Sequence, residues 1–413
     1  MATHPLENAP GTAALGAWPK PVLELCARLE GVGIAAYLQG EVLLDAWLGN
    51  PSGRVPTRAV VCVADAGQLL RALPFAVVTA ESGRRLTQAT LSGPVDLIPV
   101  GEHGIDAAFG AFGLAPFAVG FRPSDASWHA PGPVLEAISR RELGLLPERA
   151  NPFRDAPRRY WLAAQLIAEY DLEPTRELVE AGREVFPDVM TRLPEGAPAR
   201  RVLDRILACP RPSRALSFLR ETGASKAVFP GLEAGVETRV DTLAKVASLR
   251  WAAFLRGTST ARALARLRMP ADLARRISRV QEAHPLDRTV EAARDPQIRR
   301  AMARLTPEEL DGLIVWRRLE LAGERGGRDG DLLLERLAKI EAALARLRSQ
   351  VATVQSVRAL ALGGGEVMRI LGAGPGPHVG RALGHLARVI AEAPERNEPS
   401  ALTAELLAWQ AAN

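Results

Sequence analysis

The sequence has 413 residues, which predicts two to four structural units because one compact domain needs only about 100–200 residues. Hydrophobic residues make up 47% and charged residues 24%, a balance that excludes a wholly disordered chain. No apolar run approaches the roughly 20 residues of a membrane span, so no membrane partner is expected. Met1–Gly16 lacks the pattern of a signal peptide, and Cys26, Cys62 and Cys209 lie far apart in apolar surroundings. We therefore expect a cytoplasmic protein with buried thiols.

The formal charge of +5 is unevenly distributed. Residues 1–130 contain 8 basic and 11 acidic residues (net −3), whereas the remainder contains 44 and 36 (net +8). A basic region of this kind suits a polyanionic partner such as RNA. The alternative is that arginine fills ordinary surface positions, since lysine occurs only at Lys20, Lys226, Lys245 and Lys339.

Short β-rich runs alternate with short helical patterns between about Pro21 and Gly120. Five strands are expected, at Gly33–Leu38, Ala59–Val63, Phe75–Thr79, Arg85–Ala89 and Val95–Val100. Helices are expected at Pro21–Glu30, Val42–Leu48 and Ala66–Ala72. Together these elements predict a small mixed sheet with helices packed on it.

After Pro131 the pattern changes to helices of about 10–16 residues separated by Gly and Pro turns. The helical segments are Arg159–Tyr170, Pro174–Phe186, Ala199–Ala208, Ser213–Thr222, Val240–Leu255, Thr260–Arg268, Leu273–His284, Pro307–Ala322 and a long one near Asp331–Leu347. The long segment interleaves charges with leucines and an isoleucine, which predicts a core-facing stripe at Leu332, Leu333, Leu337, Ile340 and Leu344. The fold class is therefore α+β, with a small mixed-sheet head followed by an all-helical part.

No metal site is expected, because the six histidines are not paired with cysteines or carboxylates at ligand spacing. The glycine-rich segment Gly372–Gly380 resembles a phosphate-binding loop only superficially. It follows an apparent helix, Gly365–Leu371, instead of a strand, and Pro375 and Pro377 remove amide donors that a phosphate would need. A turn between two helices is the better interpretation.

Four stretches of this sequence are similar to bacterial class II tRNA nucleotidyltransferases and their poly(A) polymerase relatives. The most specific is the C-terminal pair Leu360–Met368 and Gly374–Leu383, and Cys209–Leu219 with Phe229-Pro230 also matches. The remaining two are Tyr37–Gly49, similar to the family's strand, Gly-Gly turn and Val-Arg-Asp helix start, and Asn151–Arg159, similar to its base-reading Glu-Asp-x-x-Arg motif. The resemblance covers roughly Gly31 to Trp409.

The resemblance implies a nucleotidyltransferase-like head, in which an Asp-x-Asp strand holds two Mg²⁺ ions that activate the attacking hydroxyl. The matching strand here is Thr57–Val63, which places Arg58 and Val60 at the acidic positions. Asp96 remains as a candidate remnant of a third carboxylate, and Ala111–Gly120 keeps neither the arginines nor the Asp of a further family motif. We therefore name no catalytic residue other than this remnant and expect no cofactor, or Mg²⁺ if the protein is active.

Four residues are implied as nucleotide contacts by the same resemblance, namely Gly40, Asp45, Asp155 and Arg158. In the neck motif, Arg154 replaces the family's glutamate. The alternative is that Asp155 caps a helix and pairs with the following arginine.

The expected division is a disordered segment 1–19, a nucleotidyltransferase-like head 20–130, and a helical neck 131–195, body 196–345 and tail 346–413. The resulting hypothesis is a catalytically degenerate member of this family that binds a tRNA-like RNA. Two alternatives stay open. One is an active CCA-adding or poly(A)-adding enzyme with a relocated metal pair drawn from Asp45, Asp65 and Asp96. The other is a protein-interaction scaffold with no nucleic-acid role.

Overall fold

The structure is a computed structural model that describes residues 18–48, 59–78, 86–90, 93–101, 113–115, 118–130, 132–146, 151–192, 196–233, 235–291, 294–323, 328–351 and 360–411. The chain divides into two compact units, Met1–Leu232 and Glu233–Asn413, each described by itself below. The boundary falls inside the predicted body segment, and the finer predicted limits stay predictions. The expected disordered segment 1–19 lies outside the described residues except for Trp18 and Pro19. Among the described helices, none has the length and apolar character to cross a bilayer.

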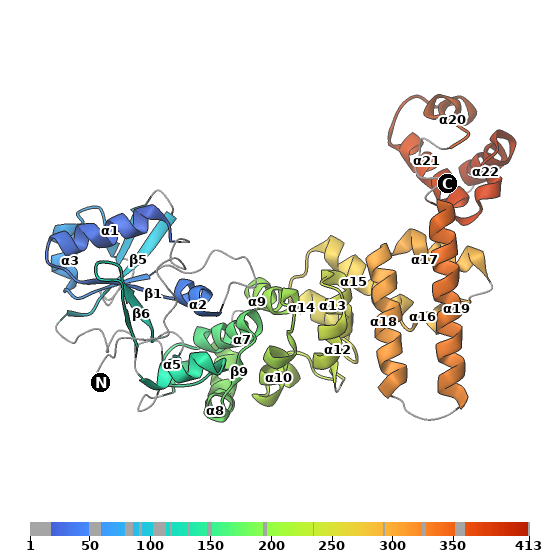
Figure 1. Cartoon of the computed structure of the whole chain (residues 1–413). Coiled ribbons are helices and arrows are strands. Elements are labelled where there is room, and N and C mark those ends of the chain that lie inside the picture. Colours follow the sequence, from blue (N-terminus) through green and yellow to red (C-terminus); the bar gives the residue numbers. More distant parts are fainter. Residues whose placement is uncertain are drawn as a thin grey trace. The chain divides into compact units, whose positions relative to one another are not determined.

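The first unit begins with a seven-stranded mixed sheet in the order β3-β4-β5-β2-β1-β6-β7 (Figure 1). β2 and β5 run parallel, and every other neighbouring pair is antiparallel. The prediction of five strands was two short, because β6 and β7 have three residues each, too few for an alternating pattern. The strands are β1 (Ala36–Gln39), β2 (Ala59–Cys62), β3 (Val77–Val78), β4 (Leu86–Thr90), β5 (Gly93–Pro99), β6 (Gly120–Arg122) and β7 (Ser127–His129).

Helices join these strands and continue after the sheet. They are α1 (Lys20–Gly31), α2 (Glu41–Leu48), α3 (Ala66–Ala72), α5 (Gly132–Ser139), α6 (Pro152–Asp155), α7 (Arg158–Tyr170), α8 (Arg176–Arg192), α9 (Ala197–Ala208), α10 (Ser213–Glu221) and α11 (Ala224–Val228). A two-stranded parallel ladder pairs β8 (Glu142–Leu143) with β9 (Glu173–Pro174). The three cysteines are free and buried, as predicted. The α+β fold class is thus confirmed.

α7 is the central helix of the helical part of this unit. Every residue from Ala163 to Tyr170 is buried, because α9 and α10 pack against it. At its first turn, the buried Tyr160 hydroxyl is hydrogen-bonded to the hydroxyl of Thr222, beyond the end of α10. The C-terminal two thirds of α7 are therefore enclosed by neighbouring helices.

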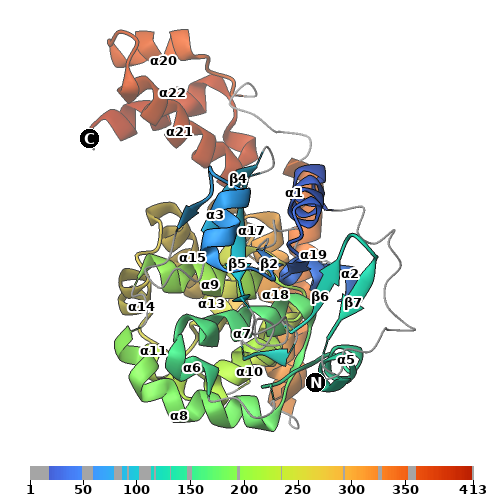
Figure 2. The same ribbon diagram turned by 90° about the vertical axis from the view of Figure 1, so that its left-hand side faces the viewer.

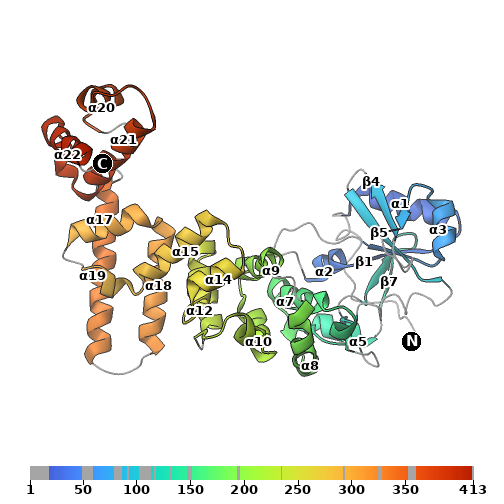
Figure 3. The ribbon, with the colours of Figure 1, turned by 180° about the vertical axis from the view of Figure 1, so that it is seen from behind.

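In the described residues of the second unit, all regular secondary structure is helical. Its helices are α12 (Val236–Thr242), α13 (Ala247–Phe254), α14 (Thr260–Arg266), α15 (Ala271–Ala283), α16 (Leu286–Thr289), α17 (Asp295–Arg304), α18 (Pro307–Gly323), α19 (Arg328–Val351), α20 (Gly364–Leu371), α21 (Pro377–Glu392) and α22 (Pro399–Ala411), with the short 3₁₀ helix η5 (Pro394–Arg396). α18 and α19 lie side by side (Figure 3). Leu337, Ile340 and Leu344 of α19 are buried, as predicted, whereas Leu332 is 61% exposed. The stripe therefore starts later than predicted, because the first turns of α19 do not pack into the core.

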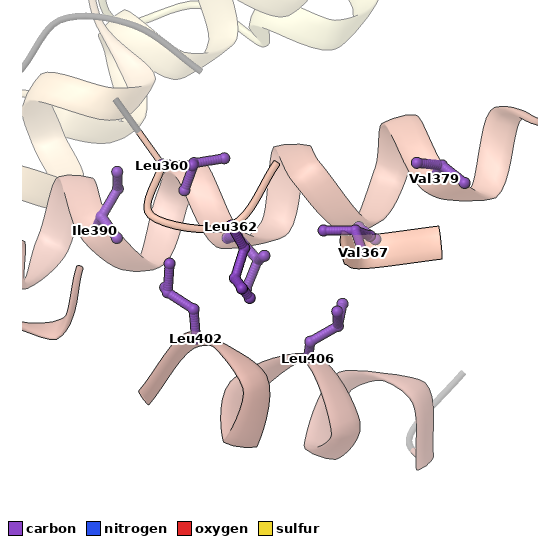
Figure 4. Packing of buried hydrophobic residues seen from close by; sticks show 9 residues of the cluster. Leu360, Leu362, Val367, Val379, Ile390, Leu402 and Leu406 are labelled. Carbon is purple, nitrogen blue, oxygen red and sulfur yellow. The ribbon is translucent and has the colours of Figure 1, made fainter. Parts of the chain in front are cut away.

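The last three helices share a core of their own (Figure 2). Figure 4 shows the residues that converge in it, which are Leu360, Leu362, Val367, Val379, Ala382, Leu386, Ile390, Leu402 and Leu406. The glycine-rich segment after α20 is a turn between helices, as predicted: Gly372 ends α20 with φ +62°, and Pro377 begins α21.

Candidate nucleotide and RNA site

The parallel pair β2–β5 is the part of the sheet where the family's carboxylates would stand. Its register places Ala59 beside Asp96 and Val60 beside Leu97. Because successive residues of a strand face opposite sides of a sheet, residues 59 and 60 belong to different faces. The register therefore decides which positions could share a metal with Asp96.

One row of side chains across the sheet is apolar, and Val60 belongs to it. We call this the apolar row; its members are Leu86, Leu97, Val60, Leu38, Phe121 and Trp128. The exposed fractions of these residues are between 0% and 6%. An acidic residue at position 60 would thus stand in the core, facing away from Asp96.

The neighbouring row carries polar groups. We call it the polar row; its positions are Thr87, Asp96, Ala59, Gln39, Gly120 and His129. Two residues further along β2, Val61 shares this face and is fully buried. A carboxylate pair on the same face as Asp96 would need residues 59 and 61, and these are alanine and valine. Arg58, the other predicted acidic position, lies outside the described residues.

Asp96 itself is half-buried on β5 and contacts the next strand. Thr87 of β4 donates a hydrogen bond from its hydroxyl to Asp96 Oδ1 at 3.2 Å. A cross-strand bond of this kind stabilises the pairing of β4 with β5 whether or not a metal binds. It gives Asp96 a structural role that the sequence did not indicate.

The polar row ends in a cluster that the sequence did not single out. Ser127 Oγ lies 2.7 Å from His129 Nε2 and 2.5 Å from Asp125 Oδ1, so serine stands between the two ionisable groups. The His129 ring packs edge-on against Tyr37, with ring centroids 5.0 Å apart. In a nucleophilic triad the histidine would occupy the middle position, so this order describes a hydrogen-bonded hairpin and no acyl-transfer site.

Gly40 lies between β1 and α2, and Asp45 lies on α2; their predicted contact with a nucleotide stays a prediction. Gly40, with φ +112°, turns the chain from β1 into α2, a conformation that favours glycine. Asp45 on α2 accepts a hydrogen bond from the Tyr170 hydroxyl at 2.6 Å, which ties α2 to the C-terminal end of α7. Arg158 begins α7, and a helix of 13 residues puts the two ends about 18 Å apart.

The neck motif is divided between two helices. Asp155 is the last residue of α6, so it does not open the following helix; Pro157 is the residue before α7. The interpretation of Asp155 as an N-cap is therefore wrong, because α6 ends at Asp155 and α7 begins only after Pro157. Arg158 is exposed, and the Asp155 side chain lies outside the described part of the structure. Arg154 forms an ion pair with Glu184 of α8, a partner that a glutamate at position 154 would repel.

The remaining acid nominated for a relocated metal pair is engaged elsewhere. Asp65 caps α3 by accepting from the Gln68 amide at 2.7 Å, while the Gln68 side chain accepts from the Asp65 amide at 2.8 Å. Among the described residues, no three His, Cys, Asp or Glu side chains are placed to hold a metal ion together.

Comparison with known proteins gives a match only at the level of structure. No protein-family model and no curated protein matches the sequence. The Bacillus stearothermophilus CCA-adding enzyme in complex with CTP superimposes with a TM-score of 0.62 at 18% identity, covering 95% of this chain and 98% of that one. The Thermotoga maritima CCA-adding enzyme complexed with tRNA gives 0.62 at 15% identity, with coverage of 97% and 98%. A further CCA-adding enzyme complex with CTP gives 0.65 at 13% identity, with coverage of 99% and 98%. Over nearly its whole length, this chain has the fold of the CCA-adding enzymes.

Proposed function

We propose that this protein is an RNA-binding relative of the CCA-adding enzymes that does not catalyse nucleotidyl transfer. The observation that carries the proposal is the register of β2 and β5, which puts Ala59 and Val61 on the face of Asp96. Two-metal transfer needs at least two carboxylates directed at the same ions, because each Mg²⁺ is held by oxygen ligands. A single acid cannot hold the pair.

The RNA-binding part of the proposal is supported by charge and by the fold. Residues 131–413 carry a net charge of +8, while the segment with the sheet is mildly acidic. A structural neighbour of near-complete coverage is a complex with tRNA. Positive charge on a chain of this fold suits the phosphate backbone of a tRNA-like RNA.

The test combines two measurements on the purified full chain. The first is incorporation of labelled CTP and ATP into a tRNA that lacks its 3′ end, with Mg²⁺ and then with Mn²⁺. The second is binding of the same tRNA, followed by fluorescence anisotropy at several salt concentrations. We expect binding that weakens steeply with salt and no incorporation.

Two results would count against the proposal in different ways. Incorporation that disappears in Asp96→Ala but persists in Asp65→Asn would identify a working enzyme with a rearranged metal site. Absence of tRNA binding even at about 0.05 M salt, in a protein with an intact unfolding transition, would favour a protein-interaction scaffold.

A further inference from the structure

His284 lies between α15 and α16 and is buried against α18. The exposed fraction of its side chain is 0%, and its ring stacks on Trp316 of α18 with the ring centroids 3.9 Å apart. His284 Nε2 lies 3.0 Å from each carboxylate oxygen of Glu320. Trp316 and Glu320 are four residues apart and therefore share one face of α18. The His284 ring thus holds the turn between α15 and α16 to this face through two separate contacts.

The contact with Glu320 decides which ring nitrogen of His284 carries the proton. Burial raises the pKa of Glu320, but hydrogen bonds from His284 and Arg317 outweigh it and hold the pKa at about 2. The carboxylate is therefore ionised and can only accept, so neutral His284 donates from Nε2 and keeps a lone pair on Nδ1. Among the described residues, none is placed to form a hydrogen bond with the buried Nδ1 atom. A second proton, on Nδ1, would have no acceptor there.

Arg317 connects this pair to α16. Its side chain is 4% exposed, and its guanidinium lies 3.2 Å from Glu320 and 2.9 Å from Asp287. Asp287 belongs to the first turn of α16 and is fully buried. These ion pairs join α16 to α18 in the surroundings of the His284 ring.

The other charged groups near the ring come from α12 and from the ends of the neighbouring elements. Glu233 lies 3.2 Å from Arg239 of α12 and 3.1 Å from Arg256, which follows α13. Arg239 also lies over the Trp316 ring, with its guanidinium carbon 5.9 Å from the ring centroid. We call six residues the ion network: Glu233, Arg239, Arg256, Asp287, Arg317 and Glu320. Its three arginines and three carboxylates balance, so a protonated His284 would add one positive charge without a matching carboxylate.

Burial lowers the pKa of His284, and it outweighs the opposite effect of the Glu320 contact. The positive charges of Arg256 and Arg317 also lower the pKa. In the unfolded chain the ring is hydrated and takes up its proton at about pH 6.5. Between that pH and the lower pKa of the folded state, the unfolded state binds more protons, so the stability of the second unit falls as the pH falls.

The same pairing occurs at a more accessible position in the second unit. His385 Nε2 of α21 lies 2.9 Å from Glu405 of α22, and its ring stacks on Trp409 with the centroids 5.9 Å apart. The His385 side chain is 21% exposed, so water can hydrate a protonated ring there. The two histidines share their chemistry and differ in burial, which makes His385 a matched control.

We propose that His284 is a pH-sensitive switch that holds α16 and α18 together while its ring is neutral and loosens their contact once the ring is protonated. The added proton sits on Nδ1 without an acceptor among the described residues, and the added charge lies where water is excluded. Both penalties disappear when the ring leaves Trp316 and becomes hydrated. Below about pH 6.5 the second unit should therefore open more often at this contact, whether or not the chain binds RNA.

The first test measures protonation of the ring in the full chain. Protein with isotope-labelled histidine is titrated by NMR between about pH 8 and pH 5, and the His284 signal is the one that His284→Gln lacks. Glutamine keeps a side-chain amide that can donate to Glu320, and it does not titrate in this range. We expect the His284 signal to titrate below about pH 6.5.

The second test follows amide hydrogen exchange in α16 and α18 over the same pH range, corrected for the intrinsic pH dependence of exchange. In the wild type, the opening constant should rise as the pH falls below about 6.5, by up to about tenfold per pH unit, because opening takes up one proton. His284→Gln should remove this rise. His385→Gln should keep it, because the His385 side chain is partly hydrated in the folded state.

Loss of the rise in His284→Gln alone would support the switch. The inference would be overturned by a His284 signal that titrates at or above about pH 6.5, or by a rise that persists in His284→Gln. Equal loss of the rise in both variants would assign it to the overall charge of the unit and would also overturn the switch. The wild-type profile decides the question even if His284→Gln does not fold, because unchanged opening of α16 and α18 down to about pH 5 would exclude the switch.

Discussion

The substitution Val60→Asp tests the register on which the proposed loss of catalysis depends. Val60 is fully buried between Leu38 and Leu97, its partners on β1 and β5. The lost burial of valine costs about 1.5–3 kcal/mol. Even a protonated carboxyl without a partner adds about 1–3 kcal/mol. The free energy of unfolding of the sheet should therefore fall by about 2.5–6 kcal/mol.

The pH dependence of the Val60→Asp effect gives an independent check. Burial raises the pKa of a carboxyl, so between the unfolded and the folded pKa the folded state binds more protons. The stability of the variant relative to wild type should then fall as the pH rises through that window. A carboxylate on an open metal-binding face would show no such trend.

Two measurements test this prediction. One is a urea titration of the purified variant, and the other is amide hydrogen exchange of the strands of the sheet. Val77→Asp on the edge strand β3 is the matched control, because Val77 is 62% exposed and its change should stay within about 0.5 kcal/mol. A Val60→Asp protein no less stable than the Val77→Asp protein would refute the register, and position 60 would again be open to a metal ligand.

Three further predictions concern other parts of the chain. Tyr170→Phe removes the 2.6 Å hydrogen bond to the Asp45 carboxylate, and chemical unfolding of the first unit should show a loss of about 1.5–3 kcal/mol; no change would mean that α2 and α7 are not tied there. Asp287→Asn leaves the 4%-exposed Arg317 side chain without its main partner and should cost the second unit about 3–5 kcal/mol, which calorimetry would detect; a neutral result would contradict the buried pair. The pKa of Glu320 of about 2 lies below its unfolded value, so the stability that this group contributes is present above pH 4.5 and is lost as the pH falls toward 2. Glu320→Gln should flatten the decline of the second unit's melting temperature in that window, and an unchanged decline would assign acid unfolding to other groups.

The sequence predicted the core of the fold well because apolar spacing is a local property. α3 was predicted at Ala66–Ala72, its observed bounds, and α1 and α2 were predicted to within one residue at either end. The turn after α20 was predicted from the helical pattern that precedes it and from Pro375 and Pro377. In each case, a few residues that are neighbours in the sequence are enough to predict the local structure.

The arrangement of the site could not be read from the sequence, because it depends on register between distant strands. In the observed register Ala59 lies beside Asp96; a shift of one residue along β2 would place Val60 there instead. The hydrogen bond from the Tyr170 hydroxyl to Asp45 joins residues 125 positions apart, so no local sequence pattern could predict it. Gly40, in contrast, was predictable as a turn because positive φ favours glycine wherever it occurs.

The apolar row and the polar row indicate how much the sequence of such a sheet can change while the fold is kept. The apolar row tolerates exchange among hydrophobic residues of similar volume, so stability preserves the character of those positions but not their identity. The polar row carries side chains that differ in chemistry, among them the fully buried Gln39 and the half-buried Asp96. A chain that drifts along both rows retains its backbone while losing the residues by which sequence comparison would detect its relatives. Structures at 13–18% identity share the fold of this chain over 95–99% of its length, while no family model matches its sequence.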